Sequence, residues 1–234
     1  MQSVWYLYAF AILSIIHVTA EFLLDPMRIR IRHTTKPLLM PLLILYAYFH
    51  ADEPHWWIIG GLFLGWIGDV VLMFRKIAAL FLVGLASFLI GHGLFIWAFL
   101  ESTGMLAGLP TWYYGLSILF AAMVVGFYVY FSPHLVGENA DKKVPVALYA
   151  TIIMGMSFTS LGILLLGSQA HRVVFSMLPF AGSLFFIASD FLLARQLFIK
   201  PFSKDQALIM LTYLLAQYLI AQGYTTHQQL AIGG

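Results

Sequence analysis

Apolar runs of membrane-spanning length recur along the chain, and they constrain its fold more than any other feature. Examples are residues 4–24, 78–100 and 112–131. A helix of roughly 17–25 predominantly apolar residues crosses the hydrocarbon core of a bilayer. With 62% of its residues hydrophobic and only 9% charged, the chain lies far outside the composition of a soluble domain. The pattern predicts an all-α integral membrane protein, because a membrane barrel would show short alternating segments instead.

Eight such runs, joined by short polar or Pro/Gly-bearing links, predict a single bundle of eight transmembrane helices in one domain, residues 1–234. The expected spans are 4–24, 36–50, 55–74, 78–100, 112–131, 144–166, 173–198 and 206–222. Pro37 falls in the first turn of the second expected span, where proline is tolerated, and Pro41 could bend that helix. The first run is too long for a cleaved signal peptide, so we expect a retained helix.

Positive charge is distributed unevenly over the links. Eleven of the twelve Lys and Arg residues lie in or beside odd-numbered links, and the exception is Arg172. Basic links favour the cytoplasmic side of a membrane. We therefore predict that this end of the bundle is cytoplasmic and that both termini lie on the opposite face. The expected location is the cell membrane, or the inner membrane if the protein is bacterial.

Two carboxylates interrupt apolar runs, Asp69 within residues 64–74 and Asp190 within residues 185–193. A carboxyl group in hydrocarbon costs at least a few kcal/mol, so it normally faces a bundle interior or a wet cavity. Our interpretation is that the helices bring the two acids together. Two close carboxylates cannot both ionise easily, so such a pair supplies an acid and a base. A proton relay, a transporter's cation site and a structural pair are also compatible with this pattern.

Further polar residues fall at similar depths in the expected spans, which predicts a cavity that opens toward the cytoplasm. They are Lys36, His92, Tyr149, Tyr213 and Gln217. His92 could shuttle a proton or serve as a hydrogen-bonding partner between helices. Lys36 could bind a phosphate head group or anchor its helix at the membrane surface.

His17 and Glu21, four residues apart, suit a metal pair or an ordinary polar contact, and we favour the contact. Small residues recur at near four-residue spacing in two spans. They are Gly61 and Gly65 before Asp69, and Gly84, Ser87 and Gly91 before His92. Close packing of helices explains such a pattern.

Five short motifs occur in order along the chain, and with them it resembles the YhhN/TMEM86 lysoplasmalogenase family. The motifs are Thr35-Lys36-Pro37, Ile67-Gly68-Asp69-Val70, residues 88–95 around His92, residues 188–194 around Asp190, and residues 213–221 from Tyr213 through Gln217. The sequence Gly91-His92-Gly93 departs mildly from the family, which has a bulkier residue after the histidine.

The resemblance implies an eight-span membrane hydrolase that cleaves the vinyl-ether bond of lysoplasmalogens. The products would be a fatty aldehyde and glycerophosphoethanolamine or glycerophosphocholine. In that reaction Asp190, the deeper carboxyl, would be the acid and Asp69 the base or charge stabiliser.

The resemblance also implies roles for the neighbouring residues. His92 and Tyr149 would orient the pair or a water molecule, Ser189, Tyr213 and Gln217 would complete the polar wall, and Lys36 would hold the phosphate. No metal, organic cofactor or nucleic acid is expected, and the partners would be a lysophospholipid and bilayer lipids. The alternative is a proton-coupled lipid or ion transporter that uses the same two aspartates.

Overall fold

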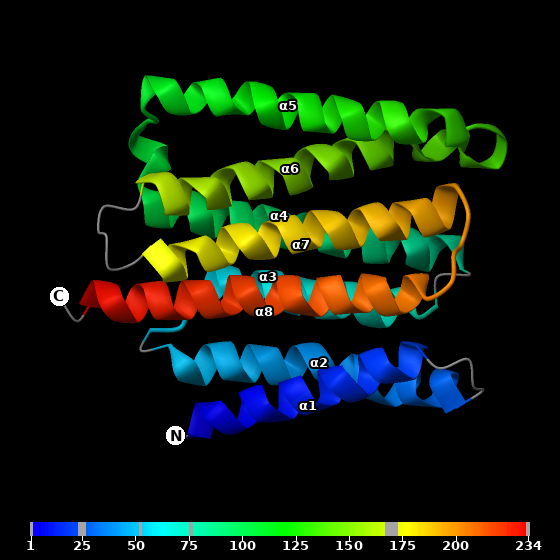
Figure 1. Cartoon of the computed structure of the whole chain (residues 1–234), viewed down its shortest axis with the longest axis horizontal. Coiled ribbons are helices and arrows are strands. Elements are labelled where there is room, and N and C mark those ends of the chain that lie inside the picture. Colours follow the sequence, from blue (N-terminus) through cyan, green and yellow to red (C-terminus); the bar gives the residue numbers. More distant parts are fainter. Residues whose placement is uncertain (1, 23–26, 52, 75–76, 167–172, 233–234) are drawn as a thin grey trace.

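The chain forms a bundle of long, nearly parallel helices (Figure 1). A computed structural model describes residues 2–22, 27–51, 53–74, 77–166 and 173–232. Within these ranges there are eight α-helices and no strand. The helices are α1 (Gln2–Phe22), α2 (Met27–His50), α3 (Trp56–Leu72), α4 (Ala78–Thr103), α5 (Thr111–Phe131), α6 (Lys143–Leu166), α7 (Val173–Phe198) and α8 (Asp205–Ile232). Short 3₁₀ turns are η1 (Met105–Ala107), η2 (Ser132–His134) and η3 (Gly137–Lys142).

The all-α prediction is confirmed, and each expected span falls within or closely overlaps one helix. Six of the described helices are long and apolar enough to cross a membrane, and α3, Trp56–Leu72, is a shorter apolar helix. These are the features of a multi-pass membrane protein. The count of eight spans and the side on which the termini lie remain predictions.

The second helix begins at Met27, well before the expected residue 36. Its first turns were not expected from the sequence, because they are polar rather than apolar. Arg30 and Arg32 lie in these turns, so a search for apolar runs does not include them. As a result Pro37 lies in the interior of α2, and its expected place in the first turn was wrong.

A side chain from the next helix compensates for one of the two prolines of α2, Pro41. Pro41 has no N–H group, so the carbonyl four residues earlier, that of Pro37, receives no helical hydrogen bond from it. The indole Nε1 of Trp66 donates to this carbonyl at 2.8 Å. In a membrane a freed carbonyl needs such a partner. This bond fixes α2 against α3 close to Lys36 and Asp69.

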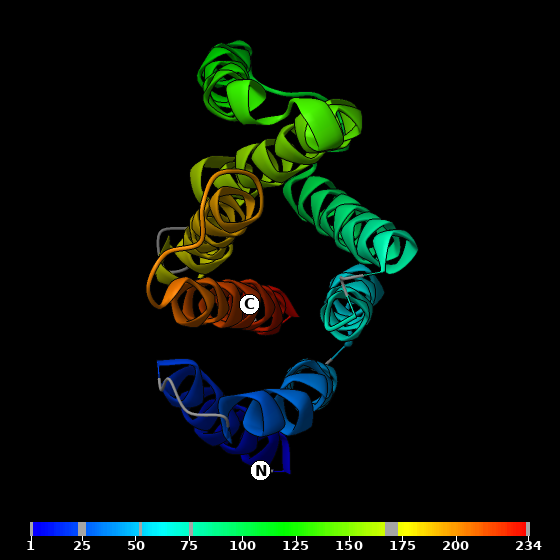
Figure 2. The same ribbon diagram turned by 90° about the vertical axis from the view of Figure 1, so that its right-hand side faces the viewer.

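Successive helices run in opposite directions, so α1 begins and α8 ends at the same end of the bundle (Figure 1). The most extensive contacts join α7 with α8, α3 with α4, and α1 with α2. Seen from its end, the bundle has α3, α4, α6, α7 and α8 around its middle, with α1 and α2 on one side and α5 on the other (Figure 2). The links α5–α6 and α7–α8 lie at the end opposite the start of α1.

Most of the predicted cytoplasmic charges belong to that opposite end. Lys142, Lys143, Lys200 and Lys204 lie in or beside its links. Three basic residues used in the charge argument, Arg75, Lys76 and Arg172, lie outside the described residues.

The predicted small-residue contacts occur between α3 and α4. A Cβ atom at Gly91 would lie 3.1 Å from the carbonyl oxygen of Gly61, so the two backbones approach closely. Ser87 donates to the carbonyl of Leu64 across the same contact at 2.6 Å. Asp69 and His92 are therefore carried by a tightly packed helix pair.

Candidate active site

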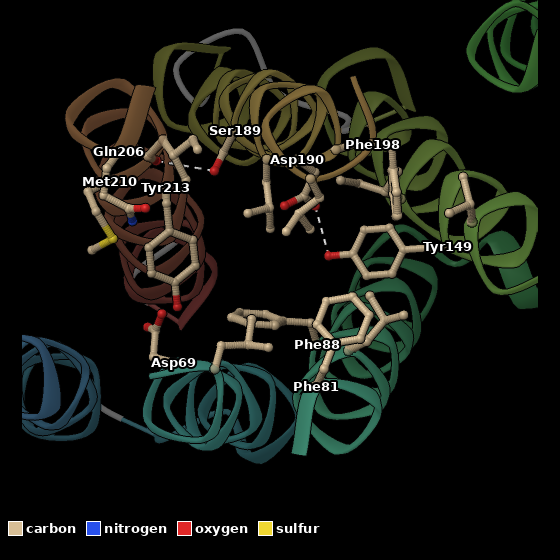
Figure 3. Close-up of a pocket in the computed structure, with 18 of the residues that line it drawn as sticks. Asp69, Phe81, Phe88, Tyr149, Ser189, Asp190, Phe198, Gln206, Met210 and Tyr213 are labelled. Atoms are coloured by element: carbon tan, nitrogen blue, oxygen red, sulfur yellow. Dashed lines mark hydrogen bonds between the residues drawn. The ribbon is translucent and has the colours of Figure 1, made fainter. Parts of the chain in front are cut away.

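A cavity of about 180 Å³ lies in the half of the bundle that contains the basic links. It is bounded by α2, α3, α4, α6, α7 and α8, with Phe127 of α5 at its edge, and its wall is mostly apolar (Figure 3). The polar side chains on the wall are Arg32, His33, Lys36, Asp69, Lys142, Tyr149, Ser189, Asp190, Gln206 and Tyr213. His33 and Leu82 are exposed at the surface as well as lining the cavity, so the space reaches the outside of the protein.

Asp69 projects from α3 and is held by partners from two other helices. Its side chain is only 6% exposed, and the ammonium of Lys36 lies 3.1 Å from Oδ1. The hydroxyl of Tyr213 on α8 points toward the Asp69 carboxylate (Figure 3). Gln217, one turn further along α8, donates from Nε2 to the Tyr213 hydroxyl at 3.1 Å. The Lys36 ammonium therefore balances the charge of Asp69.

Asp190 lies on α7 and has a neutral partner. The hydroxyl of Tyr149 on α6 donates to Oδ2 of Asp190 at 2.8 Å (Figure 3). No salt bridge to Asp190 occurs within the described ranges of the chain. Ser189, the preceding residue, lines the cavity but donates to the carbonyl of Ile209 on α8 at 3.2 Å.

His92 is buried behind the cavity wall, on α4. Its ring packs edge-on against Tyr149 and Phe186, with centroids 5.6 and 4.5 Å away. Nδ1 is 2.6 Å from the carbonyl of Phe88, which can only accept, so Nδ1 carries the proton. The buried Nε2 has no hydrogen-bond partner among the described residues, and the same holds for Oε1 of Gln217.

Most of the residues singled out from the sequence meet at this cavity. Lys36, Asp69, Tyr149, Ser189, Asp190 and Tyr213 line it, whereas His92 and Gln217 stand behind the wall and contact lining residues. The two carboxylates share the cavity but occupy different walls, each with its own tyrosine (Figure 3).

Sequence reasoning missed three cationic or titratable residues of the wall, Arg32, His33 and Lys142. Arg32 and Lys142 were counted only as charges that set topology, and the polar start of α2 hid the relation of Arg32 to the cavity. The fact that Arg32 stands four residues before Lys36, on the same helix face, is the signal that could have identified it.

His17 and Glu21 both make polar contacts with α2. His17 Nδ1 lies 2.6 Å from the Thr35 hydroxyl, and both carboxylate oxygens of Glu21 accept hydrogen bonds from Arg32. This is the contact favoured from the sequence, although the two residues bind different partners.

Comparison with known proteins places this site in a family. The family model described as "YhhN family" matches residues 31–224, which includes both carboxylates and all their partners. The chain belongs to the YhhN family. The match begins after α1 and covers the other helices almost completely.

Curated relatives of this YhhN protein carry the name lysoplasmalogenase. Lysoplasmalogenase TMEM86B of Rattus norvegicus is 28% identical over 185 residues, which is 79% of this chain and 68% of that protein. Lysoplasmalogenase TMEM86B of Homo sapiens is 31% identical over 161 residues, 69% of this chain and 60% of that protein. Lysoplasmalogenase TMEM86A of Bos taurus is 31% identical over 162 residues, 69% of this chain and 62% of that protein.

The matches to the human and bovine proteins thus span less than two thirds of those relatives. No solved structure matches the chain.

Proposed function

We propose that this YhhN protein hydrolyses the vinyl-ether bond of lysoplasmalogens, using Asp190 as general acid and Asp69 as the carboxylate that stabilises the cation and directs water. The observation that carries the proposal is the unlike pairing of the two carboxyl groups on one cavity. Asp69 is paired with a cation, and Asp190 with a phenol. The names of the curated relatives supply the substrate class.

The reaction needs both kinds of carboxyl group. A proton is added to the β-carbon of the vinyl ether, R–CH=CH–O–R′, and leaves an oxocarbenium ion. Water attacks the carbon bonded to oxygen and loses a proton, and the hemiacetal collapses to the aldehyde R–CH2–CHO and the alcohol HO–R′. An acid must give the first proton, and a negative charge must stabilise the cation.

Asp190 is assigned as the acid because of its partners. Tyr149 donates to Oδ2, which leaves Oδ1 to carry a proton toward the cavity. An uncharged carboxylic acid is the form that a buried site without a cation stabilises. Asp69 is assigned as the charged carboxylate, since the Lys36 ammonium forms an ion pair with it and the Tyr213 hydroxyl faces it.

We propose that each of the two unpartnered polar atoms behind the wall holds a water molecule. Nε2 of His92 and Oε1 of Gln217 are buried acceptors without a partner in the described part of the chain. Buried water usually satisfies such groups. A water on His92 would stand next to Tyr149, and one on Gln217 next to Tyr213, and either could resupply the hydrolytic position.

The apolar part of the wall suits the hydrocarbon chain of the substrate. Phe81, Leu82, Phe88, Phe127 and Phe198 line it. Leu82 is 53% exposed on the outer surface of α4, so a chain passing it would reach the bilayer. We place the basic end of the bundle, with the cavity entrance, on the cytoplasmic side of a cell membrane.

Product analysis tests the proposal. Detergent-purified protein is incubated with an alkenyl lysophospholipid and, separately, with its acyl counterpart, and the products are identified by mass spectrometry. We expect fatty aldehyde from the alkenyl lipid and no cleavage of the acyl lipid. Cleavage of the acyl lipid instead would refute the vinyl-ether assignment. Transport of lipid or protons into liposomes without any product would favour the transporter.

A further inference from the structure

A second ion pair stands at the cavity wall one helical turn from the Lys36–Asp69 pair. Arg32 of α2 lines the cavity, and its Nε and Nη2 atoms donate to the two carboxylate oxygens of Glu21 on α1. The Glu21 side chain is 1% exposed and that of Arg32 is 24% exposed. The pair therefore has its acid buried in the protein and its base at the cavity.

This pairing leaves part of the guanidinium available. A guanidinium group has N–H donors on three nitrogens in a fixed plane, and Glu21 engages the edge formed by Nε and Nη2. The Nη1 donors have no acceptor among the described residues. A planar fork whose orientation is fixed by a carboxylate is well suited to bind a phosphate.

The position of Arg32 relative to the reacting groups fits a lysophospholipid. Arg32 precedes Lys36 by four residues, which places it one turn, about 6 Å, nearer the start of α2. The Lys36 ammonium is held 3.1 Å from Asp69. In the substrate a three-carbon glycerol unit separates the ether oxygen from the phosphate, so a spacing of one helical turn matches it.

The charge around Arg32 also favours an anion. His33 is exposed beside it, and Lys142 lines the cavity from the α6 side. The Lys142 ammonium donates to Asn139 at 2.8 Å and lies 3.6 Å from Oδ1 of the exposed Asp141. Two basic side chains, those of Arg32 and Lys142, thus line the cavity wall, and that of Arg32 has its buried partner on the side away from the cavity.

We propose that Arg32, held in place by Glu21, binds the phosphate of the lysophospholipid head group. Arg32 is a binding residue in this account, and Glu21 is a positioning residue that acts through it. The inference rests on the proposed function for the identity of the lipid. It adds α1 to the site, although this helix lies outside the residues matched by the family model.

A binding experiment tests this site without catalysis. The full-length purified protein is titrated with a saturated 1-O-alkyl lysophosphatidylcholine, which has no vinyl bond, and with the 1-O-alkylglycerol of the same chain length. We expect the wild type to prefer the phosphate-bearing lipid. Arg32→Ala should weaken its binding by roughly tenfold or more, as for loss of a hydrogen bond to a charged group, and leave alkylglycerol binding unchanged.

Two further variants separate positioning from general structure. Glu21→Gln keeps the size of the side chain but loses its charge, so it should weaken binding of the phosphate-bearing lipid less than Arg32→Ala does and leave alkylglycerol binding unchanged. Arg30→Ala removes a cation from the exposed face of the same helix. It should change the binding of neither the phosphate-bearing lipid nor the alkylglycerol. If Arg32→Ala does not fold, Arg32→Lys replaces it and should also reduce the preference, because the planar fork is lost.

Three results would overturn the inference. They are an equal loss of affinity for both lipids, no loss in a folded Arg32 variant, and binding of soluble glycerophosphocholine as tight as that of the lysolipid. The last result would mean a site for a free phosphodiester rather than a lipid.

If the wild type releases no aldehyde but its phosphate preference depends on Arg32, the proposed hydrolysis fails and the site stands. Aldehyde release with no dependence on Arg32 refutes the site alone.

Discussion

The partners of Asp69 and Asp190 determine what each carboxyl group can do. A cation and a phenol hold Asp69, while a phenol alone holds Asp190. These contacts depend on how α2, α6 and α8 are rotated, which the spacing of residues along the chain does not specify. The sequence therefore identified the two acids, because a carboxyl in an apolar run is costly, but it did not indicate that Lys36 is the partner of Asp69.

The Lys36–Asp69 contact changes what we expect from replacing Lys36. From the sequence alone, a lysine that holds the phosphate would mainly affect KM. Because the ammonium lies 3.1 Å from a buried carboxylate, Lys36→Ala leaves Asp69 without its counter-ion. An unpaired buried charge is strongly unfavourable, so we expect kcat to fall about tenfold or more while KM changes less.

Steady-state kinetics with an alkenyl lysophospholipid measure the changes in kcat and KM separately. Lys143→Ala is the matched control, since Lys143 lies at the same end of the bundle but does not line the cavity. A rise in KM that exceeds the fall in kcat would return Lys36 to the role of phosphate ligand.

At the scale of elements, the contact between α2 and α3 determines whether Lys36 reaches Asp69. Trp66 donates to the Pro37 carbonyl. Pro37 directly follows Lys36 on α2, and Trp66 lies one turn before Asp69 on α3. Trp66→Phe would keep the aromatic contact and leave that carbonyl unsatisfied. We expect a loss of about 1–3 kcal/mol in stability, together with reduced turnover.

Thermal unfolding in detergent measures the loss of stability in Trp66→Phe. Trp112→Phe is the control, because Trp112 is 56% exposed on α5. Equal melting temperatures for Trp66→Phe and wild type would show that the bond to Pro37 does not hold the two helices together.

The helices themselves were largely predictable, and the exceptions have a physical cause. Apolar runs located α1, α4, α5, α6 and α7 closely. The early start of α2 was missed because a helix with Arg30 and Arg32 in its first turns can be stable without being apolar. Arg32 and its contact with Glu21 were missed for the same reason, since a residue outside an expected span was interpreted only as a topological charge.

At the scale of the whole molecule, the account places the basic end of the bundle in the cytoplasm. The chain contains no cysteine, so single cysteines can report the side on which a link lies. Ala107 in η1 and Ala140 in η3 are both exposed and lie at opposite ends of the bundle. In intact cells a membrane-impermeant maleimide should label Ala107→Cys and spare Ala140→Cys until the membrane is permeabilised. The reverse pattern would invert the proposed orientation.

The central claim is that Asp190 gives a proton to the vinyl carbon, and one labelling measurement addresses it directly. The protein and its Asp190→Asn variant are incubated with an alkenyl lysophospholipid in D2O, and the aldehyde is reduced at once and examined by mass spectrometry. The account predicts one deuterium on the carbon next to the aldehyde carbon. It also predicts that a folded Asp190→Asn variant makes the aldehyde about 10²–10⁴ times more slowly, the usual contribution of a general acid. Aldehyde formed by Asp190→Asn at the wild-type rate, or formed without deuterium at that carbon, would contradict the account.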